Sequence, residues 1–163
     1  MTGAMLDGNH SVVRQTLLAL WKAWWLTRLL RLRTDVGSLL PPVASRDDNS
    51  GDVMPEKVWG QVDAIVRPFL FWKFSKRCFY RSFCVASVLR QRGVDARLGF
   101  GLHVSGHKRR LCHCWVTVDG HALCENPDPR QTFPVPLGEW DGLVCYWLAD
   151  DDKKTTGDQP NEE

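Results

Sequence analysis

The sequence SKRCFYRSFCVASVLRQRG, residues 75–93, decides the fold, because it predicts one central helix with a cysteine in its first turn. Ser75 can act as N-cap by accepting hydrogen bonds from the first backbone N–H groups. Gly93 suits the left-handed position that follows a helix. Small and apolar side chains recur at three- and four-residue spacing and form a face suited to burial. They are Ser82, Val85, Ala86 and Leu89.

Cys78 lies at the start of this helix, where unpaired N–H groups and the positive end of the helix dipole stabilise a thiolate. Arg77 and Arg81 add positive charge nearby. A cysteine at the start of a central helix is also how several cysteine hydrolases place their nucleophile. The alternative is a packed structural cysteine, because cysteine is among the most buried residue types.

Composition sets limits on the class of protein. The chain has 163 residues, about one domain, and 44% of them are hydrophobic. A net charge of +2 is too small to indicate a nucleic-acid partner. The N-terminus lacks a clean signal peptide, and no uncharged apolar run is long enough to span a membrane. We therefore expect a cytoplasmic protein whose six cysteines are thiols.

Residues 11–33 predict a helix rich in Leu and Trp, preceded by a loose polar segment at 1–10. The helix is apolar over most of its circumference, so it is either buried or docked on a partner. Trp21, Trp24 and Trp25 are suitable anchors for a partner groove. Association of this helix with a membrane surface is the remaining alternative.

The rest of the chain predicts an α+β protein with its helices before an antiparallel sheet. A polar linker at 44–52 precedes a helix that begins at Pro55 and is kinked or ended by Pro68. Strands are predicted at 96–104, 111–118, 121–125 and 142–148, with a loop at 126–136. Three regions follow from this reading: an N-terminal helix and linker (1–53), a core (54–149) and a disordered acidic tail (150–163).

His113 in the second predicted strand is the candidate base for Cys78. A thiol nucleophile needs a base within hydrogen-bond distance, and that base needs an orienting group. Strand alternation places His113, Trp115 and Thr117 on one face, so Trp115 can cover the imidazole and exclude water. A histidine that is packed in a sheet without any catalytic role is the alternative.

The orienting group must come from the segment after the Asp119-Gly120 hairpin signal. A two-residue turn sets Asn126 opposite His113, whereas a three-residue turn sets Glu125 opposite it. A carboxylate or an amide can orient an imidazole. We favour Glu125, with Asn126 and Asp128 as alternative third members.

A zinc site is a competing interpretation of the ligand-rich segment that contains Cys112, His113, Cys114, His121 and Cys124. Strand alternation directs His113 away from its two cysteine neighbours, and the segment lacks the CxxC pair that begins a zinc knuckle. We therefore predict neither a metal nor another cofactor.

The stretches CFYRSFCVASVLRQRGVDARLGFGLHV and HCWVTVDGHALCE together resemble the transglutaminase-like leader peptidase of bacterial lasso-peptide biosynthesis, the protein B family. The positions that match this family are Cys78, Arg81, Ser82, Gly93, His113, Trp115, Asp119, Gly120 and Glu125. The resemblance implies a catalytic triad of Cys78, His113 and Glu125, supported by Arg81, Ser82 and Trp115. It also favours the three-residue turn. Cys114 and Thr117 depart from the family pattern without touching the triad.

The resemblance implies a cytoplasmic cysteine peptidase that removes the leader from a ribosomally made precursor peptide. It implies a stand-alone form that works with a separate leader-recognition protein and hands the core peptide to an ATP-dependent cyclase. Another transglutaminase-like hydrolase or acyltransferase, and a non-catalytic binding module on the same fold, are the two alternatives.

Overall fold

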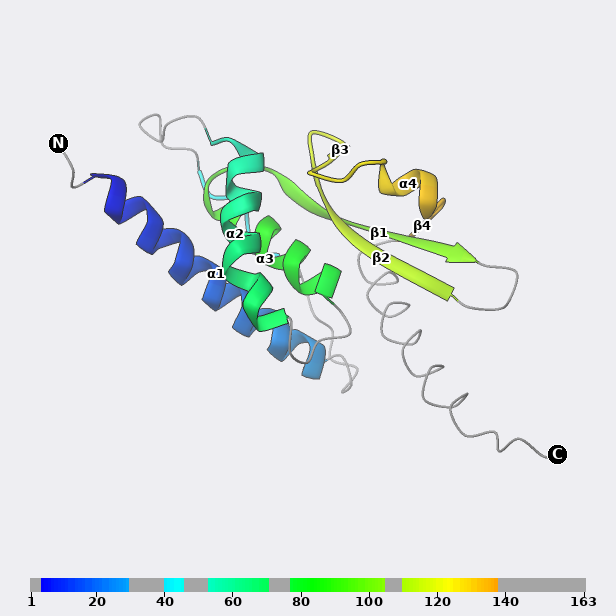
Figure 1. Ribbon diagram of the computed structural model, residues 1–163, viewed down its shortest axis with the longest axis horizontal. Helices are drawn as coiled ribbons and strands as arrows, with labels where there is room; N and C mark the ends of the chain where they lie inside the picture. Colours follow the sequence, from blue (N-terminus) through cyan, green and yellow to red (C-terminus); the bar gives the residue numbers. More distant parts are fainter. Residues whose placement is uncertain (1–3, 30–39, 46–52, 71–76, 105–109, 138–163) are drawn as a thin grey trace.

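Three helices precede the sheet in the computed structural model, which describes residues 4–29, 40–45, 53–70, 77–104 and 110–137 (Figure 1). The helices are α1 (Ala4–Leu29), α2 (Pro55–Leu70) and α3 (Arg77–Gln91), and a short α4 (Pro129–Thr132) follows later. The strands are β1 (Ala96–Val104), β2 (Arg110–Val118), β3 (His121–Ala122) and β4 (Val135–Leu137). The predicted α+β class is confirmed.

Two helix boundaries differ from the predictions. Helix α1 begins at Ala4, so the prediction that residues 1–10 are loose is wrong from that residue on. This segment contains no proline, and its Ala, Met and Leu are good helix formers. Helix α2 begins at Pro55 as predicted and continues past Pro68 to Leu70. The backbone hydrogen bond that proline removes falls in the last turn, where its loss does not stop the helix.

Helix α3 ends as the sequence predicts. Gly93 adopts φ 79°, its N–H donates to the Arg90 carbonyl (3.1 Å), and the Val94 N–H donates to the Leu89 carbonyl (3.0 Å). These two bonds form a Schellman motif, which satisfies the last carbonyl groups of the helix. The predicted N-cap, Ser75, lies outside the described residues.

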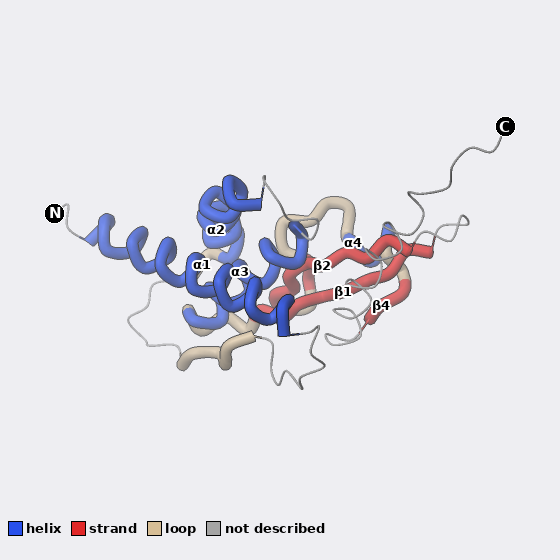
Figure 2. The backbone as a smooth tube through the Cα atoms, turned by 90° about the horizontal axis from the view of Figure 1, so that it is seen from below, coloured by secondary structure: helices blue, strands red, loops and turns tan. Residues whose placement is uncertain are grey.

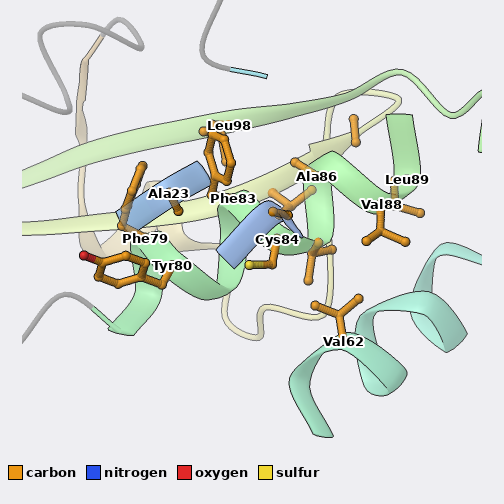
Figure 3. Packing of buried hydrophobic residues seen from close by; sticks show 14 of the residues in the cluster. Ala23, Val62, Phe79, Tyr80, Phe83, Cys84, Ala86, Val88, Leu89 and Leu98 are labelled. Carbon is orange, nitrogen blue, oxygen red and sulfur yellow. The ribbon is translucent and has the colours of Figure 1, made fainter. Parts of the chain in front are cut away.

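Helix α3 is the centre of the core rather than an amphipathic surface helix. It contacts α1, α2, β1 and β2. Every residue from Phe79 to Leu89 is buried except Arg81. Figure 3 shows side chains of α1, α2 and β1 packed around it, including Ala23, Val62 and Leu98. The single buried face predicted for α3 is therefore too narrow, because α1, α2 and the sheet all pack against the helix.

Helix α1 belongs to the same core. Val12, Ala19 and Ala23 are buried in the cluster that α3 centres, and the Cys84 thiol of α3 donates to the Thr16 carbonyl across 3.9 Å. Figure 2 shows α1 together with α2 and α3 at one end of the molecule and the strands at the other. The boundary predicted at residue 53 stays a prediction, but it does not separate two cores.

The sheet is antiparallel with strand order β3-β2-β1-β4. The β1–β2 register places Gly101 opposite His113 and Gly99 opposite Trp115. The other face of this hairpin meets the helices and includes the buried residues Leu98, Phe100, Cys114 and Val116. The structure thus confirms the predicted alternation.

The segment after β2 departs from the prediction in three ways. Strand β3 ends at Ala122, so the predicted strand 121–125 is too long. The segment 126–136, predicted to be a loop, contains helix α4, and β4 begins within it and pairs with β1. The turn itself is a two-residue turn, because Val118 pairs with His121 and both turn residues have positive φ. The predicted strand 142–148, which contains Cys145, and the tail 150–163 lie outside the described residues.

Candidate active site

Cys78 is the second residue of α3, so its half-buried thiol lies in the first turn of a buried helix. Its side chain hydrogen-bonds with the imidazole of His113, which comes from β2. One partner is therefore fixed by the helix and the other by the sheet. The sequence assigned these two residues to the site, and the structure brings them together.

The His113 imidazole also faces Glu125, with 3.6 Å between Nε2 and Oε1. The hydrogen bond with Cys78 and then that with Glu125 outweigh desolvation and raise the pKa of His113 from 6.5 to about 9. The imidazole is consequently protonated at neutral pH, which makes it an acid that can donate to a leaving group.

Glu125 reaches the imidazole by a route that the sequence did not reveal. The observed two-residue turn, continued as a regular strand, would set Asn126 opposite His113, so the predicted three-residue turn is wrong. The strand instead leaves its ladder after Leu123, whose N–H donates to the Val116 carbonyl across 2.8 Å. Cys124 then adopts φ 55°, and this left-handed residue turns the chain so that Glu125 reaches His113.

The two alternative third members lie close by in the chain but have other surroundings. Asn126 is exposed. Asp128 caps α4 by accepting from the Arg130 N–H and Nε, each across 3.0 Å, and these hydrogen bonds lower the pKa of its carboxyl group. Arg130 also donates to the Gly120 carbonyl across 2.9 Å, which ties α4 to the β2–β3 turn.

Aromatic rings cover the imidazole. The ring of His113 is stacked on Phe133 (5.0 Å between centroids, 25° between planes) and on Trp115 (6.0 Å, 26°). Trp115 was predicted to cover His113, whereas Phe133, which follows α4, was missed. The rings shield most of the imidazole from water, leaving its side chain 21% exposed, and this strengthens its polar interactions.

Two glycines of β1 make room for these rings. A Cβ atom at Gly101 would lie 2.7 Å from the Phe133 carbonyl oxygen and 2.9 Å from Trp115 Cη2. At Gly99 it would lie 2.4 Å from Trp115 Nε1. The alternating glycines in a strand opposite His113 and Trp115 were the sequence signal that could have indicated this close packing.

Ser82 connects the two elements that carry the thiol and the imidazole. Its buried hydroxyl donates to the carbonyl of Cys114 across 3.1 Å. Ser82 follows Cys78 by four residues in α3, and Cys114 is the residue after His113 in β2. This hydrogen bond therefore fixes the start of the helix relative to the strand.

Arg81 lies on the side of the site nearest α2. Its guanidinium group is 3.4 Å from Glu125 Oε1 and 3.9 Å from Asp63 Oδ1. Its Cζ atom lies 5.3 Å from the centroid of Trp59. Asp63 and Trp59, both from α2, are the partners that sequence reasoning did not find.

The other cysteines have different surroundings. Burial raises the pKa of the Cys84 thiol to about 12, so this thiol is protonated at neutral pH. Burial also raises the pKa of exposed Cys124, with the charges of Glu56 and Glu125 as smaller causes. Within the described segments, no three Cys, His, Asp or Glu side chains are arranged to hold a metal ion.

A half-buried thiol at a helix start, hydrogen-bonded to an imidazole that a carboxylate orients, is typical of thiol-dependent hydrolases and acyltransferases. The comparison with protein families agrees with this class. A model of the transglutaminase-like superfamily matches residues 17–137, and the chain therefore belongs to that superfamily. Its members are usually cysteine proteases or transferases. Neither the curated proteins nor the solved structures contain a match to the chain.

Proposed function

We propose that this protein is a cysteine peptidase that removes the leader from a lasso-peptide precursor. The observation that carries the proposal is the contact between the Cys78 thiol and the His113 imidazole. Glu125 lies on the same imidazole, with 3.6 Å between Oε1 and Nε2. The motif that resembles the leader peptidases of lasso-peptide biosynthesis supplies the substrate class. The family match supports the coarser class of cysteine hydrolase or acyltransferase.

In the proposed reaction, the Cys78 thiolate attacks the carbonyl carbon of the peptide bond between leader and core. Backbone N–H groups at the start of α3 stabilise the resulting oxyanion. The His113 imidazolium gives its proton to the leaving nitrogen, the C–N bond breaks, and a thioester of the leader remains on Cys78. His113 then accepts a proton from water, whose oxygen attacks the thioester and releases the leader carboxylate. Glu125 orients the imidazole in both steps.

Reconstitution with precursor peptide and leader-recognition protein tests this function. We expect Cys78→Ala to abolish leader removal, and Cys112→Ala, which changes a thiol of β2 outside the triad, to preserve it. Mass spectrometry of the products should show a core peptide with a free N-terminus and a leader with a free carboxylate. Leader removal by Cys78→Ala at the wild-type rate would refute the assignment.

The same experiment separates the two alternatives. A transglutaminase-like acyltransferase would join the acyl group to an amine, and the product mass would show an adduct instead of a free carboxylate. A non-catalytic binding module would leave the precursor intact in the wild type, and its Cys78 would alkylate no faster than an ordinary exposed thiol.

We further propose that the leader-recognition protein docks on the outer face of α1. This face exposes apolar side chains, with Trp21 62% and Trp25 45% exposed. Exposed tryptophans are frequent binding anchors. Arg14 and Lys22, the charged residues on the described surface of α1 between 11 and 26, are both exposed and favour a partner with an acidic rim. Among the helices that the structure describes, none combines the length and apolarity needed to cross a bilayer.

Binding measurements with the Trp21→Glu variant test this docking site. We expect the substitution to weaken binding of the leader-recognition protein at least tenfold, while Met54→Glu, at an exposed apolar side chain before α2, leaves it unchanged. Equal weakening by both variants would refute a site on α1. The proposal would also be refuted if the cyclase or vesicles of anionic lipid, and not the leader-recognition protein, bound to this face of α1.

A further inference from the structure

The sheet does not hold the carboxylate of Glu125 in place. Strand β3 ends at Ala122, and Glu125 follows a left-handed residue in a segment without ladder hydrogen bonds. Its side chain is 22% exposed, so water competes for the carboxylate. A glutamate in such a segment needs a partner outside its own strand in order to remain directed at the imidazole.

Arg81 is that partner by position. The distance from Arg81 Nη2 to Glu125 Oε1 is 3.4 Å, and the same oxygen lies 3.6 Å from His113 Nε2. One carboxylate oxygen is thus shared between guanidinium and imidazole. The two cations approach it from different elements, α3 and β2, so together they restrict where the carboxylate can lie.

Helix α2 in turn restrains the guanidinium group. Asp63 Oδ1 is 3.9 Å from Arg81 Nη1, and the Trp59 ring lies under the planar group, with its centroid 5.3 Å from Cζ. Stacking on an aromatic ring and pairing through separate nitrogens are properties of arginine that lysine does not reproduce. These two contacts with α2 therefore restrict where the guanidinium group can lie, independently of Glu125.

We infer that Arg81 is a positioning residue that holds the Glu125 carboxylate against the His113 imidazole. This inference rests on the proposed function, because it assigns the carboxylate a role in orienting the base. Since Arg81 follows Cys78 by one turn of α3, a single helix would then fix both the nucleophile and the anchor of the third member.

Two effects of Arg81 on His113 have opposite signs, and this makes the inference testable. As a positive charge near the imidazolium, Arg81 disfavours protonation of His113, so its loss would raise the pKa of His113. As an anchor for Glu125, it favours protonation, so its loss would lower that pKa. If positioning is the main effect, Arg81→Ala lowers the pKa of His113, and it does so only when Glu125 is present.

The experiment is an NMR titration of the imidazole nitrogens in the full chain, with the His113 signal identified by its loss in His113→Gln. We expect Arg81→Ala to lower the pKa of His113 by about one unit. The same change in the Glu125→Gln background should have no further effect, as a double-mutant cycle of coupled residues requires. Arg81→Lys should give an intermediate value, and Arg97→Ala, at the exposed Arg97–Asp95 pair, the wild-type value.

A higher or unchanged pKa of His113 in Arg81→Ala would overturn the inference, and so would an equal decrease in the Glu125→Gln background. The titration also separates this inference from the proposed function. If Glu125→Gln alone leaves the pKa of His113 unchanged, the triad itself is wrong. If Glu125→Gln lowers it and Arg81→Ala does not, the positioning role alone is wrong.

Discussion

Substitution of Gly101 by alanine tests the packing that covers the proposed base. The added Cβ atom would lie 2.7 Å from both the Cβ atom and the carbonyl oxygen of Phe133, and 2.9 Å from Trp115 Cη2. Because one of these atoms belongs to the backbone, a rotamer change alone does not relieve the overlap. Phe133 must move, and its ring is the one stacked 5.0 Å from the His113 ring.

Overpacking of this kind costs about 1–3 kcal/mol of stability. For a chain of 163 residues this lowers the melting temperature by roughly 3–10 °C. A shift of Phe133 also releases the imidazole, and misplacement of a catalytic group by about 1 Å can cost up to a hundredfold in rate. We therefore expect Gly101→Ala to melt earlier and to remove the leader about ten- to a hundredfold more slowly.

Thermal unfolding followed by circular dichroism, together with the leader-removal assay, measures both effects. Gly60→Ala is the matched control, since Gly60 lies in α2 and a Cβ atom there meets nothing within 4 Å. This control should gain about 0.4–1 kcal/mol from the reduced freedom of the unfolded chain and retain full activity. If Gly101→Ala unfolds and cleaves like the wild type, Phe133 and Trp115 do not pack on Gly101 and the proposed cover is absent.

Three further predictions concern the same region. Ser82→Ala removes the hydrogen bond to the Cys114 carbonyl and should lower the free energy of unfolding in urea by about 1 kcal/mol; an unchanged midpoint would contradict the tether. Native alkylation at pH 8 should modify Cys78 and spare Cys84, whose pKa is about 12, whereas both react after denaturation; native labelling of Cys84 would show that it is not buried. The pKa of His113 is about 9 when folded and 6.5 when unfolded, so its stabilisation is complete below about pH 6.5 and lost as pH rises through 9. Wild-type stability should therefore fall over that window by up to about 3 kcal/mol, and His113→Gln should show a smaller slope; equal slopes would argue against the shift.

The sequence was sufficient where local rules decide the structure. The helix that carries Cys78 and its stop at Gly93 follow from spacing and from the special backbone freedom of glycine, and the structure has both. The hairpin at Asp119-Gly120 follows from the turn propensity of these residues. Strand alternation placed His113 and its neighbouring tryptophan on one face, as the observed register confirms.

The sequence was insufficient where one residue departs from regular geometry. Both hairpin registers were open, and choosing the register that sets Glu125 opposite His113 led to the wrong turn. The structure reconciles the two-residue turn with a nearby Glu125 through the left-handed conformation of Cys124. Cysteine has no particular preference for that conformation, so no local signal indicates it. Phe133 was missed for a related reason, since its contact with His113 depends on how α4 folds back over β1.

The site depends on local and long-range contacts to different degrees. Cys78, Arg81 and Ser82 lie within five consecutive residues of α3, and each contacts a residue of the sheet or of the segment that follows it. Because the rigid helix fixes their spacing, these residues set the positions of β2 and Glu125 relative to the thiol when the sheet packs on α3. The aromatic cover has no such template, because it needs the β1 glycines and the segment that ends in Phe133. We therefore expect substitutions in the cover to change rates by degrees, whereas loss of the Cys78–His113 contact abolishes the proposed reaction.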